Sequence, residues 1–210
     1  MAQGLNKKLN QARWFYGLIL FSTGVGVALN FARRGTPEFH RNGAVYDGLL
    51  HFFLSPEDIV PVVALALFAG LRGPEYGRRT LFILPVSWFA GCLLGTQATH
   101  APAWPVAAIS FLVFGGLVAA NAHLSLRVTT LLAVLLGVVH GWMNGAGVIW
   151  TASLVLVYMG LVGGIFVLVA LVSALVIAIQ PPWTKIVVRV AGSWIVATGL
   201  LLLGWAARRR

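Results

Sequence analysis

The chain has 210 residues, of which 59% are apolar and only 10% are charged, and its mean hydropathy is +0.89. A soluble domain of this length needs far more charged surface, so the composition excludes that class and predicts an integral membrane protein in a lipid bilayer. Fifteen basic against five acidic residues give a formal net charge of +10. Most of the basic residues flank apolar runs as topology signals, which argues against nucleic acid as a partner.

Seven apolar runs approach the length of about 20 residues that crosses the hydrocarbon core. We therefore predict an all-α polytopic membrane helix bundle of about seven transmembrane helices, six plus an N-terminal helix that resembles a signal anchor. The whole chain, residues 1–210, forms a single membrane domain in this interpretation. The sixth run is long enough to tilt or to bend near Gly163. The predicted spans cover residues 14–32, 57–72, 80–97, 104–122, 128–147, 149–179 and 186–206.

The first span follows Lys7, Lys8 and Arg13, a pattern shared by cleaved signal peptides and by signal anchors. Because the chain begins at Met1, we expect an anchor that is retained. With the amino terminus in the cytoplasm, seven spans place most of the positive charge inside, although Arg33, Arg34, Arg41 and the terminal arginines would lie outside. The residues expected on the cytoplasmic side are Arg72, Arg78, Arg79, Arg127 and Lys185.

A first polar cluster precedes the second span. Ser55, Pro56, Glu57 and Asp58 read as the start of a helix, with a capping residue, a proline in the first turn and two acids that complement the helix dipole. Capping alone can explain these residues. His51 offers a second interpretation, because a bend at Ser55 would bring its imidazole near both carboxylates and form part of a shell for a divalent transition metal.

A second polar cluster lies inside the fifth span. Gly137, Gly141 and Gly145 recur every four residues and predict a groove that lets a neighbouring helix backbone approach closely. His140 and Asn144 each precede one of these glycines and are four residues apart, so they share a helix face beside this contact. The pair is therefore predicted to point toward another helix, where His140 would add a nitrogen donor to a metal site.

Other kinds of site have weaker support. Cys92 is the single cysteine, so there is no disulfide framework, no Cys-x-x-Cys motif and no c-type haem attachment. A haem held by two histidines, His140 with His51 or His100, stays open as a further interpretation. We expect no enzyme, because the sequence contains no nucleophile with an adjacent base, no phosphate-binding loop and no zinc-protease pattern.

The order of these features resembles the HupE/UreJ family of nickel and cobalt permeases. A histidine is followed by an acidic helix start, a Gly-Arg-Arg turn, a span ending in Leu-Leu-Gly, and later Leu-Leu-Gly-Val-Val-His-Gly-Trp-Met-Asn-Gly-Ala-Gly. The similarity runs from about Gly48 to Ala206. It implies a helix bundle over 48–206, preceded over 1–47 by an anchor helix and an extracytoplasmic loop, and it implies a bacterial inner (cytoplasmic) membrane.

Members of that family carry His-Pro-x-x-Gly-x-Asp-His in an early span. By position, His51 keeps the first histidine, while Phe52 replaces the proline and Ser55 the glycine. Glu57 stands for the aspartate and Asp58 for the second histidine. The resemblance therefore implies a metal-handling role for this segment with one imidazole exchanged for a carboxylate.

The later family motif is His-Gly-x-x-His-Gly-x-Glu. His140, Gly141 and Gly145 match it, whereas Asn144 stands at the second histidine and Gly147 at the glutamate. The exchanges in both motifs make the implied site harder and richer in oxygen donors. They are compatible with a changed metal preference and with a site that has lost transport.

Two functions follow from the resemblance. The first is a secondary permease for a divalent transition metal, with nickel or cobalt as substrate and no resident cofactor. The second is a non-transporting structural or accessory subunit of a larger membrane complex, held by partner subunits or by copies of itself. The candidate metal ligands are His51, Glu57, Asp58, His140 and Asn144.

Overall fold

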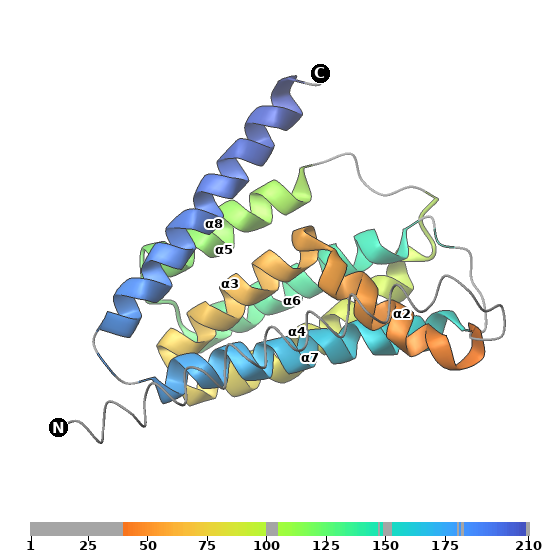
Figure 1. Ribbon diagram of the computed structural model, residues 1–210, viewed down its shortest axis with the longest axis horizontal. Coiled ribbons are helices and arrows are strands. Elements are labelled where there is room, and N and C mark those ends of the chain that lie inside the picture. The colour runs from red at the N-terminus through yellow and green to blue at the C-terminus, as the bar shows by residue number, and fades with distance from the viewer. Residues whose placement is uncertain are drawn as a thin grey trace, which may run out of the picture. The chain divides into compact units, whose positions relative to one another are not determined.

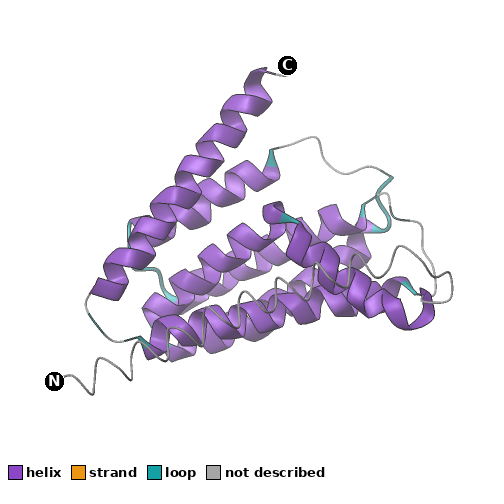
Figure 2. Cartoon of the chain, viewed as in Figure 1, coloured by secondary structure: helices purple, strands orange, loops and turns teal. Residues whose placement is uncertain are grey.

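The computed structural model describes residues 40–99, 105–146, 148, 153–179, 181 and 183–208 (Figure 1). Its contacts divide the chain into residues 1–43 and 44–210, and the second unit contains all the described helices except the first residues of α2. Every regular element of the described residues is an α-helix (Figure 2). The predicted first span, 14–32, lies outside the described residues. The helices are α2 (His40–Leu54), α3 (Pro56–Arg72), α4 (Pro74–Gly95), α5 (Val106–Ala119), α6 (Leu126–Gly145), α7 (Leu154–Ala178) and α8 (Trp183–Arg208).

The six later predicted spans all contain helices, α3 to α8, but they differ in their capacity to cross a membrane. Among the described residues, α6, α7 and α8 are long and apolar enough, and the bent pair α2 and α3 is a fourth candidate. α5 has only 14 residues. α4 begins with an acid and two arginines, which lower its hydropathy. The all-helical membrane protein is therefore confirmed, with three to four candidate spans among the described residues, whereas a bundle of about seven spans is not confirmed.

The chain bends sharply between α2 and α3, whose axes differ by 76°. Pro56 begins α3 and lacks a backbone N–H, and it forces Ser55 into an extended conformation with φ −102° and ψ 91°. α2 was not predicted from the sequence, in which its residues up to 47 were expected to form a loop. The helix lies against α7, where a Cβ added at Gly48 or Gly160 would overlap the backbone of the other helix. Close packing of helix backbones thus holds α2 in place.

The predicted glycine groove of the fifth span is confirmed. Gly137, Gly141 and Gly145 lie on the side of α6 that packs against α4. A Cβ at Gly141 would overlap the carbonyl oxygen of Trp88, and one at Gly145 would overlap that of Cys92. No larger residue fits at this distance between the helices. The contact therefore fixes the rotation of α6 about its axis and, with it, the direction of the neighbouring polar side chains.

The remaining helices surround α3, which packs against α4, α5 and α7, while α8 packs mainly on α5. α7 continues as one helix through Gly163, where the sequence suggested a bend. Trp88, Phe52 and Phe68 are fully buried and form part of the core.

Three helices, α3, α5 and α7, finish at the same end of the bundle at which α4, α6 and α8 begin. We call this end the basic end. It carries the arginines and the lysine predicted to be cytoplasmic, and its side of the membrane stays a prediction.

Candidate functional site

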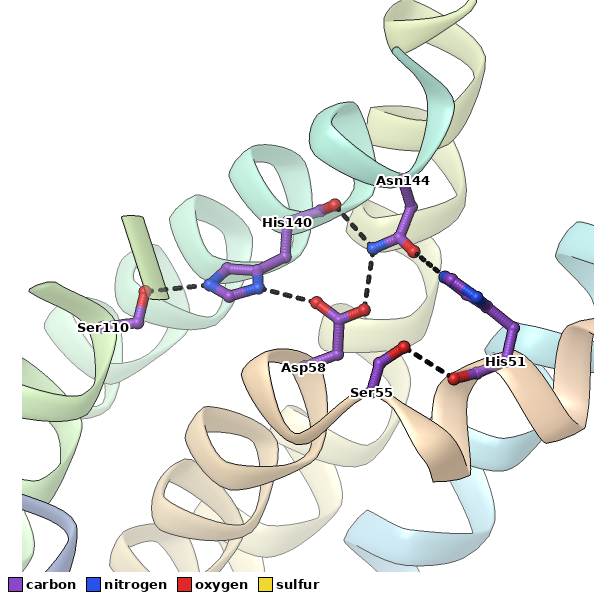
Figure 3. A network of polar contacts seen from close by, with 6 residues as sticks. All are labelled: His51, Ser55, Asp58, Ser110, His140 and Asn144. Carbon is purple, nitrogen blue, oxygen red and sulfur yellow. Dashed lines mark hydrogen bonds and ion pairs between the residues drawn. The ribbon is translucent and has the colours of Figure 1, made fainter. Parts of the chain in front are cut away.

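Six polar residues from four helices form a connected group of hydrogen bonds, which we call the polar network (Figure 3). It lies toward the end opposite to the basic end, where α3 begins and α6 finishes. α2, α3, α5 and α6 all contribute to it, together with the break between α2 and α3. Its members are His51, Ser55, Asp58, Ser110, His140 and Asn144.

The carboxylate of Asp58 lies at the centre of the network. The residue is in the first turn of α3 and is only 4% exposed. Its Oδ1 accepts a hydrogen bond from Nδ1 of His140 at 2.9 Å, and its Oδ2 accepts one from Nδ2 of Asn144 at 3.0 Å. Both carboxylate oxygens are thus turned toward α6, so capping of α3 does not explain this side chain.

Ser55 occupies the predicted N-cap position, but its hydroxyl does not cap the helix. Its backbone carbonyl accepts hydrogen bonds from the N–H groups of Asp58 and Ile59. Its Oγ donates to the carbonyl oxygen of His51 at 2.7 Å. This bond links the last turn of α2 to the break and holds His51 close to the start of α3.

His140 is held from both sides of its ring. The residue is 1% exposed, and Nδ1–H must be the donor to Asp58 because a carboxylate has no hydrogen to give. Nε2 lies 2.9 Å from Oγ of Ser110 on α5, so in the neutral tautomer it accepts the serine hydroxyl hydrogen. The Trp88 ring packs against the imidazole with centroids 5.4 Å apart. These contacts leave the imidazole one orientation and one neutral tautomer.

Asn144 connects the buried part of the network to its exposed part. The two hydrogens of its Nδ2 go to Asp58 Oδ2 and, at 2.9 Å, to the carbonyl oxygen of His140. Its Oδ1 accepts a hydrogen bond from Nε2 of His51 at 2.8 Å, which assigns the hydrogen of that imidazole to Nε2. His51 is exposed, whereas Ser110 is buried. The network therefore runs as a continuous polar path from the surface into the bundle.

The hydrogen-bond directions make Asp58 the final acceptor of this path. With both imidazoles neutral, the network carries one formal negative charge, that of Asp58. Among the described residues its hydrogen-bond partners are His140 and Asn144, and no lysine or arginine pairs with it. Buried charges in membrane proteins are costly and mark ion or substrate pathways. The arrangement is thus suited to accept a cation or a proton.

The structure brings together four of the five predicted ligands and leaves one apart. Glu57 is exposed on α3 and makes no hydrogen bond or ion pair with the described residues. Ser110 was missed by the sequence analysis, although a serine within an apolar helix is a known source of interhelical hydrogen bonds. His100, one candidate for a haem ligand, lies outside the described residues.

The donor set of the network combines two imidazoles, one carboxylate and one amide. Carboxylate oxygen and imidazole nitrogen both suit divalent transition metals. No group of three or more His, Cys, Asp or Glu side chains in the described residues is arranged to hold a metal ion. The imidazole, carboxylate and amide groups are hydrogen-bonded to one another. A cation must therefore break at least one of these hydrogen bonds in order to bind.

The comparison with protein families identifies the chain. The model described as HupE / UreJ protein matches residues 20–202, which is most of the sequence. The chain therefore belongs to the HupE/UreJ family, as the resemblance predicted, and is an integral membrane protein. Neither the curated proteins nor the solved structures contain a match to it.

Proposed function

We propose that this member of the HupE/UreJ family is a secondary permease that carries a divalent transition metal, nickel or cobalt, through the polar network. The proposal rests mainly on one observation, the buried carboxylate of Asp58, which has an imidazole and an amide as its only described partners. Family membership supports the same function, because the family is linked to nickel and cobalt transport.

The chemistry of the polar path supports binding in steps. His51 is the exposed residue of the network and meets an arriving cation first. Glu57 lies one residue before Asp58 on the outside of α3, where its charge attracts cations without belonging to the network. The cation then displaces the amide of Asn144 and reaches the carboxylate of Asp58. When the Ser110 hydroxyl rotates away, Nε2 of His140 becomes free to bind the cation as a ligand.

The membrane potential supplies a driving force for uptake. Moving a divalent cation to the negative side gains about 4 to 5 kcal/mol per 100 mV. This gain exceeds the cost of breaking one hydrogen bond to the charged carboxylate, about 1.5 to 3 kcal/mol. A site of modest affinity, which releases its ion readily, is therefore compatible with transport.

A structural or accessory subunit is the second candidate, and one observation favours it. The imidazole, carboxylate and amide groups of the network are hydrogen-bonded to one another, and the network joins α2, α3, α5 and α6 without a ligand. Such a network acts as a polar link between helices. In this alternative the partners are other subunits of a membrane complex or further copies of the chain.

Uptake of radiolabelled nickel and cobalt into proteoliposomes tests the permease. The purified chain is reconstituted alone with an inside-negative potential, and wild type is compared with Asp58→Asn and His140→Ala. Glu75→Gln is the matched control, because Glu75 is an exposed carboxylate at the basic end. We expect uptake by wild type and by the control, and none by the two network variants.

The second candidate has a different outcome. Wild-type protein that is inserted and monodisperse but takes up neither ion would contradict the permease and favour the subunit. Uptake that is unchanged by Asp58→Asn would show that transport does not use the polar network. Thermal unfolding of each variant in detergent verifies that a loss of uptake is not a loss of folding.

A further inference from the structure

A second polar feature lies at the basic end and has no part in the proposed metal path. A cavity of about 500 Å³ opens there between the end of α3, the first turns of α4 and α8, and the segment that joins α5 to α6. Its volume falls within the range of about 300 to 1,000 Å³ that is usual for small-molecule sites. The polar residues that line it are Arg72, Tyr76, Asn121, His123, Ser125 and Lys185.

The lining of this cavity has positive charge. Arg72 and Lys185 supply two cations, and none of the described lining residues is acidic. The helices α4, α6 and α8 all begin at this end, and residues of their first turns or caps line the cavity. Helix N-termini carry a partial positive charge. The cavity is therefore an electrostatically favourable place for an anion.

Several hydrogen-bond donors in the cavity have no described acceptor. Nε of Arg72 is buried without a partner, while its Nη2 donates to Oδ1 of Asn121 and its guanidinium lies 5.9 Å from the ring centre of Phe68. These contacts hold the guanidinium in place, while the hydrogens of its Nη1 have no described acceptor. Lys185 has no partner among the described residues, and Oγ of Ser125 accepts from the N–H of Val128, which leaves its own hydrogen to donate.

We propose that this cavity binds a phosphate group. A tetrahedral anion with several acceptor oxygens can accept hydrogen bonds from the terminal Nη1 of Arg72, the ammonium of Lys185 and the hydroxyl of Ser125 together. The position at the end of apolar helices is that of lipid headgroups, where basic pockets between helices bind anionic lipids. A soluble phosphate compound from the aqueous side offers the same chemistry.

Ligand-induced stabilisation of the purified full chain in detergent tests this site. Three probes are titrated at matched ionic strength: short-chain phosphatidylglycerol, a diacylglycerol of the same chain length that lacks phosphate, and inorganic phosphate. We expect a saturable rise of Tm with a phosphate-bearing probe and none with the diacylglycerol. Stabilisation by phosphatidylglycerol alone identifies a lipid headgroup, and stabilisation by inorganic phosphate identifies a soluble source.

Charge variants decide whether the cavity is responsible. Arg72→Gln and Lys185→Gln should each raise the half-saturating probe concentration about tenfold, which corresponds to one charge-assisted hydrogen bond. Arg79→Gln is the control, because this arginine is exposed at the same end and does not line the cavity. Lys185→Gln keeps the test valid if Arg72→Gln does not fold. Equal half-saturation in wild type and Lys185→Gln, or no stabilisation by either phosphate-bearing probe, would overturn the proposal.

Discussion

Nδ1 of His140 lies 2.9 Å from Oδ1 of Asp58, although 82 residues separate them in the chain. Both residues are buried, and they come from different helices, α6 and α3. Neither side chain forms a further ion pair with a lysine, an arginine or another acid among the described residues. The stability of the bundle and the proposed transport therefore depend on the same contact.

Asp58→Asn should destabilise the protein more than Glu57→Gln does. An amide at position 58 accepts one hydrogen bond but turns its NH₂ toward a donor, so a buried polar group loses its partner at a cost of about 1 to 3 kcal/mol. Glu57 is exposed without a described partner, and its change should stay within about 0.5 kcal/mol. Thermal unfolding in detergent measures both variants. Equal Tm values for the two would contradict a central role for Asp58.

Gly141→Ala should separate α4 from α6. The added methyl group overlaps the carbonyl oxygen of Trp88, and overpacking of this kind costs about 1 to 3 kcal/mol. Gly163→Ala is the matched control, because nothing lies within 4 Å of a Cβ at that position and alanine favours the helix. We expect a lower Tm for the first variant and an unchanged or higher Tm for the second. The same fall in both would mean that the glycine contact is not tight.

Ser110→Ala removes the partner of Nε2 of His140. The buried imidazole nitrogen then has no hydrogen bond, and we expect a loss of about 1 to 3 kcal/mol in stability. ¹⁵N NMR of the imidazole should show the chemical shift of Nε2 change while Nδ1 stays protonated. Ser193→Ala, at an exposed serine of α8, is the control and should change neither quantity. A Nδ1 that loses its hydrogen in wild type would contradict the assigned tautomer.

His51→Gln should preserve part of the transport that His51→Ala abolishes. A glutamine amide can donate to Oδ1 of Asn144 in place of Nε2, whereas alanine leaves that oxygen to water. Because His51 is exposed, both variants should fold with little change in Tm. Initial rates of nickel uptake compare them. Full activity of His51→Ala would remove this residue from the path.

Nickel should stabilise the purified wild-type chain if the polar network binds it. A ligand that binds only the folded state at 100 times its Kd adds about 2.7 kcal/mol to the free energy of unfolding. The rise in Tm should be lost in Asp58→Asn and retained in Glu75→Gln, whose exposed carboxylate lies at the basic end. A rise that persists in Asp58→Asn would place the bound nickel elsewhere in the protein.

The sequence alone predicted the membrane class, the family and six of the described helices. These features depend on local properties, since hydropathy over about 20 residues identifies a span and a four-residue spacing identifies a helix face. For this reason the glycine groove of α6 and the shared face of His140 and Asn144 were predicted correctly. The predicted number of about seven spans is not confirmed, because α4 and α5 are too polar or too short to meet the same criterion.

Only the tertiary structure decided which acid joins the network. Glu57 and Asp58 are adjacent, and adjacent residues on a helix point about 100° apart, so the rotation of α3 against α6 selects Asp58. The helix α2 forms against the backbone of α7, and Ser110 meets His140 because α5 packs on α3 beside α6. Each of these contacts joins segments far apart in the sequence, and their geometry is set by how closely the helices pack.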